Sequence, residues 1–227
     1  MLKRTCGVVL AVTIWLITGF AQDSPESLLQ KAKAGDPAAE VQVGMLYAIG
    51  KGVPRDAETA MVWFKKSADQ GNAEGQYKLG GMYDVGVRPQ QPATAVKWYQ
   101  LAAKQGYVDA EYRLGVMYQT GRGVAQSDAQ AATWFQKAAE HGRPEAQFRL
   151  GEMYEQGKGV PKDYHLAFKW YSAAASQGRP EAEYKLGQLY EQGWGVPQSN
   201  AQAVQWYTQA SQHGDVDARA ALEALQK

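Results

Sequence analysis

The amino-acid sequence predicts an all-α fold, a right-handed superhelical α-solenoid of about 12 antiparallel helices, and two regular spacings support this. Tryptophans recur at intervals of 35, 36, 36 and 36 residues, and each is followed by Phe or Tyr: Trp63, Trp98, Trp134, Trp170 and Trp206. Glycines keep the same interval, at Gly71, Gly106, Gly142, Gly178 and Gly214. A fixed period of about 20 to 50 residues is typical of proteins built from stacked structural repeats.

Each repeat has the pattern of two helices joined by a turn. The first helix of the fourth copy places four side chains on one apolar stripe: Ala146, Leu150, Met153 and Tyr154. A Gly-x-Gly-Val turn follows at residues 157–160. The second helix begins at a capping side chain such as Asp163 and ends at a glycine that can adopt the left-handed conformation. Further glycines lie inside the first helices, where each costs about 1 kcal/mol relative to Ala, so we expect close helix packing at these positions.

The repeats divide the chain into five copies and two end helices. The copies cover residues 36–70, 71–105, 106–141, 142–177 and 178–213, within a repeat region of 36–214. We expect capping helices over 22–35 and 215–227, because the end units of a solenoid must cover an otherwise exposed core. The turn of the second copy, residues 86–89, lacks the second glycine and is one residue shorter. We therefore expect a different turn shape there between intact helices.

Residues 1–21 have the pattern of a secretory signal peptide. Lys3 and Arg4 precede a mostly apolar stretch at 8–20, and Gly19 and Ala21 supply small side chains for cleavage after residue 21. This pattern predicts a periplasmic or secreted protein with no integral membrane segment after cleavage. The alternative is a retained anchor, for which the apolar stretch is shorter than the roughly 20 residues that a bilayer requires. Cleavage would also remove Cys6, the only cysteine.

The composition and motifs argue against several classes of function. A net charge of +1 gives no broad basic surface for nucleic acid. We find no metal-binding His or Cys motif, and the Gly-x-Gly turns lie between helices instead of after a strand, as a phosphate-binding loop requires. The sequence therefore predicts no catalytic, cofactor or metal site. His141 and His213 occupy the same repeat position at the end of the second helix, where we expect them to be exposed and favoured by the helix dipole.

A family resemblance is carried by motifs that recur from copy to copy and are clearest in the fourth: Leu150-Gly151, Met153-Tyr154, the turn at 157–160, Ala167, Trp170 and the alanines at 173–175. With these motifs the chain resembles the Sel-one-like repeat family, which is related to tetratricopeptide repeats, over residues 36–214. The resemblance implies a scaffold or adaptor that binds a protein or peptide partner. Exported bacterial members of the family support envelope assembly, signalling or host contact, so it also implies a partner in the cell envelope.

If the copies stack as tetratricopeptides do, their first helices line the concave face of the solenoid. The candidate partner-binding residues are those expected on this face or beside it: Val41, Met45, Tyr77, Asp84, Tyr112, Phe148, Glu152, Glu155, Tyr184, Glu191 and Trp194. Four of them form an aromatic ladder, Tyr77, Tyr112, Phe148 and Tyr184. The ladder is either a set of anchors for a ligand or a part of the core between copies.

The charges of the first helices suggest the chemistry of a ligand. Pairs of opposite charge four residues apart, such as Glu145 and Arg149, support the helix itself. The acidic residues that this spacing leaves without a partner are Asp84, Glu152, Glu155 and Glu191. They predict a peptide with basic and apolar residues, extended or helical, along the concave face.

Two further alternatives remain at this point. Trp194 stands where other copies have Lys or Arg, so it either covers a neighbouring helix or is an exposed contact residue. A glycan-binding or peptidoglycan-binding envelope module, in which Tyr and Trp rings stack on sugars, is the alternative function. A hydrolase has less support, because no catalytic pairing of titratable residues is visible.

Overall fold

The computed structural model describes residues 24–86 and 89–225, which form twelve α-helices, one short π-helix and no strand. The predicted signal peptide at 1–21 lies outside the described residues. Within them, no helix has both the length and the apolar character needed to span a bilayer. The elements are α1 (Pro25–Lys33), α2 (Pro37–Ile49), α3 (Ala57–Asp69), α4 (Ala73–Gly81), η1 (Met82–Gly86), α5 (Pro92–Lys104), α6 (Val108–Thr120), α7 (Asp128–Glu140), α8 (Pro144–Gln156), α9 (Tyr164–Ala175), α10 (Pro180–Gln192), α11 (Asn200–Gln212) and α12 (Val216–Leu225).

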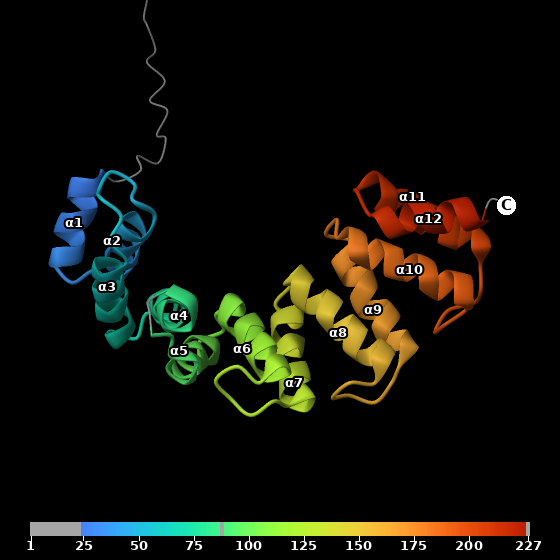
Figure 1. Cartoon of the computed structure of the whole chain (residues 1–227), viewed down its shortest axis with the longest axis horizontal. Helices are drawn as coiled ribbons and strands as arrows, with labels where there is room; N and C mark the ends of the chain where they lie inside the picture. Colours follow the sequence, from blue (N-terminus) through green and yellow to red (C-terminus); the bar gives the residue numbers. More distant parts are fainter. Residues whose placement is uncertain (1–23, 87–88, 226–227) are drawn as a thin grey trace, which may run out of the picture.

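The helices follow one another along an arc with a hollow on one side (Figure 1). Each helix packs on the helix before it and the helix after it in the chain, and α1 and α12 lie at opposite ends of the arc. This arrangement confirms the predicted all-α solenoid. In the middle of the arc, the first helices α4 and α6 lie nearer the hollow than the second helices α5 and α7 (Figure 1).

Aromatic side chains join the core of each copy to the next. Trp98 packs against a buried cluster that spans the first two copies and contains Phe64 of the first and Leu79 of the second. Trp134 packs in the same way against the cluster that contains Tyr99 and Leu114. No copy therefore completes its core alone, and stability depends on neighbouring copies.

The glycines inside the first helices face the buried aromatic ring of the second helix of their own copy. They are Gly44, Gly80, Gly115, Gly151 and Gly187. A Cβ atom added at Gly151 would lie 2.6 Å from a ring carbon of Tyr171, which is fully buried. The structure thus confirms the close packing that offsets the low helix propensity of glycine.

Both glycines of the recurring turn are required by geometry. Gly193 ends α10 with φ +69°, a left-handed conformation that favours glycine. Gly195 has φ +70°, and a Cβ there would lie 2.5 Å from the backbone of Tyr164 at the start of α9. The first glycine thus ends the helix, and the second lets the turn contact the preceding copy.

The second copy accommodates its shorter turn by changing the end of its first helix. After Gly81 the chain continues as the π-helix η1, so the expectation that both helices stay intact is corrected. The amide of Gln91 still donates to the Tyr83 carbonyl at 2.8 Å, as Ser127 does to Tyr118 at 2.9 Å. The altered helix end therefore compensates for the missing residue while the following helix keeps its anchor.

Candidate functional site

The candidate residues differ widely in exposure. Val41 is only 2% exposed and packs in the core with Ala60 and Phe64, so it presents little surface to a partner. Met45 is half-buried. Asp84 is 5% exposed, although the sequence suggested a surface carboxylate.

The aromatic ladder contacts side chains of its own copy and of the next copy. The centroids of the Tyr112 and Phe135 rings lie 5.7 Å apart. The Arg143 guanidinium lies 4.5 Å from the centroid of the Tyr112 ring. Phe148 contacts Tyr171 and Arg179 in the same way. Tyr77 contacts Tyr99 at 5.6 Å and Tyr107 at 5.0 Å. Tyr184 lies 5.5 Å from Tyr207. These contacts support the alternative in which the ladder is part of the packing between copies.

Two acidic candidates accept hydrogen bonds from buried tyrosines. The Tyr171 hydroxyl donates to Glu155 at 2.5 Å, and the Tyr207 hydroxyl donates to Glu191 at 2.6 Å. Burial, followed by these hydrogen bonds, raises the pKa of both tyrosines. Where the ring is Phe64 or Phe135, the residue at the acid's position is Ala48 or Gln119. A carboxylate thus stands at this position only in copies where the facing ring is a tyrosine.

Asp84, Glu152 and Glu155 also form ion pairs with Arg or Lys, so the expectation that these acidic candidates lack partners is wrong. Arg122 donates through Nε to Asp84 at 2.6 Å, and Lys185 Nζ lies 3.1 Å from Glu155. Glu152 lies 3.1 Å from Arg149. Spacing along one helix missed these contacts, because most of the partners come from the second helix or from the next copy. Acidic residues that are already paired give no reason to expect a basic ligand.

A buried polar pair joins the first helix of each copy to the end of its second helix, and these pairs form a column along the arc. Glu111 and Glu183 are 2% and 0% exposed, and they contact Nδ1 of His141 and His213 at 2.8 and 2.9 Å. In other copies both partners are glutamines, and their side chains contact at 2.9 Å: Gln76 with Gln105, and Gln147 with Gln177. The histidines are half-exposed at helix ends as expected, but each also binds a buried carboxylate on the first helix of its own copy. In the first copy, burial raises the pKa of Glu40, and its hydrogen bond to Gln70 opposes this.

Trp194 covers a neighbouring helix. Its ring stacks on Tyr164 at the start of α9, with 5.1 Å between centroids and 22° between planes. The side chain remains 39% exposed. Other tryptophan faces are covered by lysines, with Lys66 4.2 Å from the Trp63 ring and Lys137 4.4 Å from the Trp134 ring.

Two hollows lie on either side of Met45. The larger, of about 750 Å³, is bounded by α1 and α2 and lined by residues that include Leu28, Met45 and Ile49. The smaller, of about 300 Å³, is bounded by α2, α4, η1 and α6 and lined by residues that include Met45, Tyr77 and Arg113. The candidates Met45, Tyr77 and Asp84 meet at this second hollow. The candidates of the later copies lie elsewhere along the arc.

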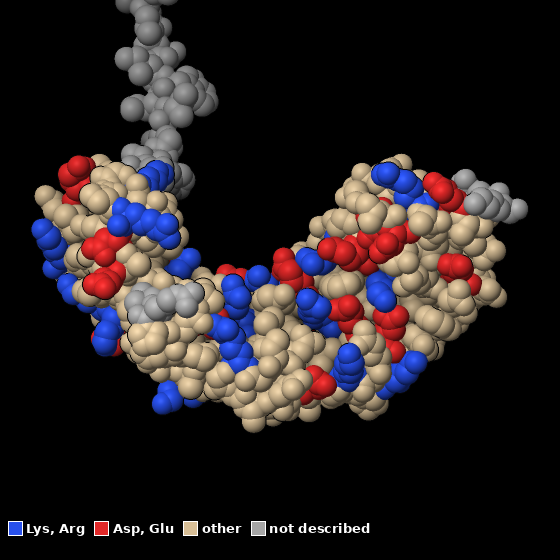
Figure 2. Space-filling model, in the orientation of Figure 1, with Lys and Arg blue, Asp and Glu red and all other residues tan. Residues whose placement is uncertain are grey.

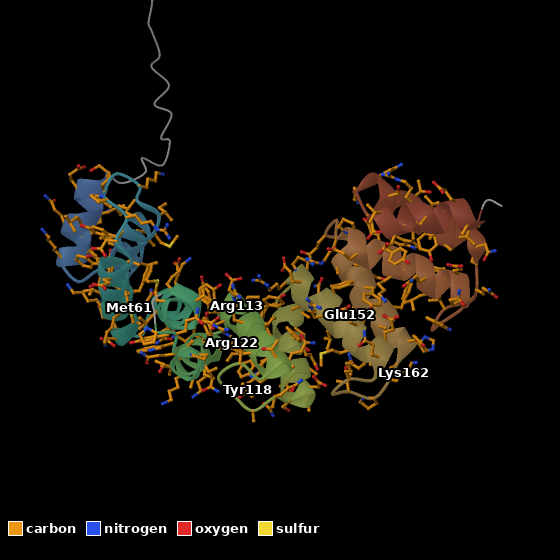
Figure 3. The ribbon with its side chains drawn as sticks, viewed as in Figure 1. Met61, Arg113, Tyr118, Arg122, Glu152 and Lys162 are labelled. Atoms are coloured by element: carbon orange, nitrogen blue, oxygen red, sulfur yellow. The ribbon has the colours of Figure 1, made fainter. Side chains whose placement is uncertain are left out.

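Charged groups are distributed unevenly over the inner side of the arc. Blue side chains are frequent over α4 to α6, and red side chains gather over the arm that contains α8 to α11 (Figure 2). Arg113 and Glu152 lie nearer the hollow of the arc than Tyr118 and Lys162 (Figure 3). Burial lowers the pKa of Arg113, but its hydrogen bond with Tyr77 and the nearby acidic groups outweigh burial and raise it. Among residues 24–86 and 89–225, no three His, Cys, Asp or Glu side chains are grouped to hold a metal ion.

Comparison with known structures finds close relatives of this arc. A protective antigen of uropathogenic Escherichia coli strains with an SLR fold is 39% identical, with a TM-score of 0.86 over 88% of this chain and 43% of that one. A Sel1 repeat protein from Oxalobacter formigenes is 37% identical, with a TM-score of 0.79 over 89% of this chain and 59% of that one. The chain thus spans about half the length of these two proteins. No curated protein sequence matched it.

The Sel1 repeat model matches five segments of the chain: 37–72, 73–107, 108–142, 144–178 and 180–215. Solenoids of such repeats are typically non-catalytic scaffolds for protein–protein interaction. The matched segments cover most of the chain and coincide with consecutive helix pairs of the arc. The chain therefore belongs to the Sel1 repeat family.

Proposed function

We propose that this protein is an exported interaction scaffold that binds a peptide segment of a cell-envelope protein on the inner side of its arc. The observation that carries the proposal is the pair of hollows on either side of Met45. Both have linings that are more apolar than polar, and both open on the first helices of the first two copies. A peptide with two apolar side chains would bury them there, while backbone and polar groups stay at the rim.

The remainder of the inner side supports this location of the site. Along α6, α8 and α10, Arg143 bridges Asp109 and Glu145, and Arg179 bridges Glu145 and Glu181. These charged side chains already form ion pairs with one another, so a charged partner gains less by binding there. The pattern at residues 1–21 supports export to the periplasm or beyond, where the partner would be another envelope protein.

The glycan-binding alternative gains no specific support. Sugar stacking requires an open aromatic face. Tyr77, Tyr112 and Phe148 contact neighbouring copies, and lysines cover Trp63 and Trp134. These contacts favour an apolar peptide anchor over a sugar platform.

Photocrosslinking in the native envelope tests the proposal with a matched pair of positions. Ile49 lines the larger hollow and is 60% exposed, whereas Val62 lies on the second helix α3 and is 56% exposed. A photoreactive phenylalanine at position 49 should give a discrete protein adduct on irradiation, and the same group at position 62 should give none. Equal labelling at both positions, or no protein adduct at either, would contradict the proposal.

A further inference from the structure

Four cations occupy equivalent positions along the first helices, and they differ in their partners. They are Lys78 on α4, Arg113 on α6, Arg149 on α8 and Lys185 on α10. Arg149 lies 3.1 Å from Glu152, and Lys185 lies 3.1 Å from Glu155. Within the part of the chain that the structure describes, Lys78 and Arg113 form no ion pair. The first two cations of the column thus keep an unneutralised positive charge.

Both of these cations line the smaller hollow. Apolar side chains make up much of the rest of its lining, including Met45, Met82 and Val85, which is 64% exposed. The one carboxylate in the lining is Asp84, and Arg122 already binds it through Nε at 2.6 Å. The hollow therefore combines an apolar floor with a net positive rim, in agreement with the basic side chains over α4 to α6 (Figure 2).

The neighbouring contacts hold Arg113 in place for a ligand. Arg113 shares the lining of the hollow with Tyr77, whose phenol helps to raise the pKa of Arg113 and whose ring packs against Tyr99 and Tyr107. A guanidinium that is held in this way offers its remaining N–H groups to a carboxylate as a planar pair of donors. Less side-chain entropy is lost on binding when the donor is already positioned.

We infer that the smaller hollow binds an acidic-apolar peptide segment of the partner, with an apolar side chain beside Met45 and Val85 and a neighbouring Asp or Glu carboxylate at Arg113 and Lys78. This inference rests on the proposed function and specifies the chemistry of its ligand. A basic peptide at the same place would bring like charges together without a free carboxylate to bind. The expected charge of the peptide is therefore negative, whereas the sequence suggested a basic peptide.

Selection from a random peptide library displayed on phage, with the purified full chain as bait, tests the inference separately from the function. Enrichment of peptides with an Asp or Glu next to a large apolar residue supports the inference. Enrichment of basic or uncharged apolar peptides that fail to bind a Met45→Lys variant overturns the inference and leaves the scaffold function standing. Enrichment of no peptide overturns both.

The affinities of two variants for one enriched acidic peptide then show which cation of the protein binds the peptide carboxylate. By fluorescence anisotropy, Arg113→Gln should weaken binding about ten- to a hundredfold, because it removes a charge-assisted hydrogen bond. Arg149→Gln is the matched control, since Arg149 already pairs with Glu152, and it should change affinity less than about twofold. Circular dichroism checks that both variants are folded. Equal affinities for the two folded variants would overturn the inference.

Discussion

Replacing Gly80 by Ala should destabilise the protein by about 1–3 kcal/mol, the usual cost of overpacking a well-packed core. A Cβ at Gly80 would lie 2.8 Å from ring carbons of Tyr99, which is only 2% exposed. The ring cannot move away without disturbing the cluster that joins the second and third copies. The gain in helix propensity, about 1 kcal/mol, does not offset this clash.

The adjacent glycine provides the matched control. At Gly81 the nearest atom to an added Cβ is the Tyr99 hydroxyl oxygen at 3.7 Å, an ordinary contact distance. Gly81→Ala should therefore raise stability slightly, by up to about 1 kcal/mol. Urea unfolding followed by tryptophan fluorescence measures both variants. A Gly80→Ala protein as stable as Gly81→Ala would show that the close approach of α4 and α5 does not exist.

Replacing His141 by Ala should cost about 1–3 kcal/mol, because it leaves the Glu111 carboxylate buried without its partner. Glu111 is 2% exposed, and His141 Nδ1 is the side-chain partner that the structure shows for it, at 2.8 Å. His141 itself is 49% exposed, and water that replaces its ring would relieve part of the loss. For this reason we expect less than the full cost of breaking a buried ion pair.

Another copy of the repeat shows which pair of residues should restore the stability lost in His141→Ala. Gln147 and Gln177 form the equivalent contact one copy later, at 2.9 Å. The double variant Glu111→Gln/His141→Gln should recreate that contact and recover stability to within about 1 kcal/mol of the original protein, whereas His141→Ala does not. The urea concentrations at the unfolding midpoints of the double variant and of His141→Ala measure this difference in stability. A double variant as unstable as His141→Ala would show that the column does not stabilise the packing of the two helices within a copy.

The regular features of the fold could be predicted from the sequence because the same residues recur in the same register. The positions of Trp, Ala and Gly in each copy report helix packing directly, and the structure places them as expected. The second copy was harder to predict. A missing glycine and a shortened turn indicate a change, but they do not show that the helix end will become η1.

The charged residues of the site could not be paired from the sequence by helix spacing alone. Glu145 and Arg149 stand four residues apart, yet Glu145 contacts Arg143 and Arg179, and Arg149 contacts Glu152. The contact of Glu145 with Arg179 depends on how the next copy is placed, and a helical wheel contains no such information. Arg149 pairs with Glu152 at i,i+3 instead of with Glu145 at i,i−4, and spacing allows either choice. Comparing the copies with each other would have given a signal, because acids stand opposite tyrosines and smaller or neutral residues stand opposite phenylalanines.

Hydrogen exchange of the full chain, with and without a saturating peptide from the library selection, tests the account most directly. Binding on the inner side of the first two copies predicts slower exchange in α2 (Pro37–Ile49) and α4 (Ala73–Gly81), with little change in α7 and α11. Protection confined to second helices, or to the arm that contains α8 to α12, would contradict the proposed site.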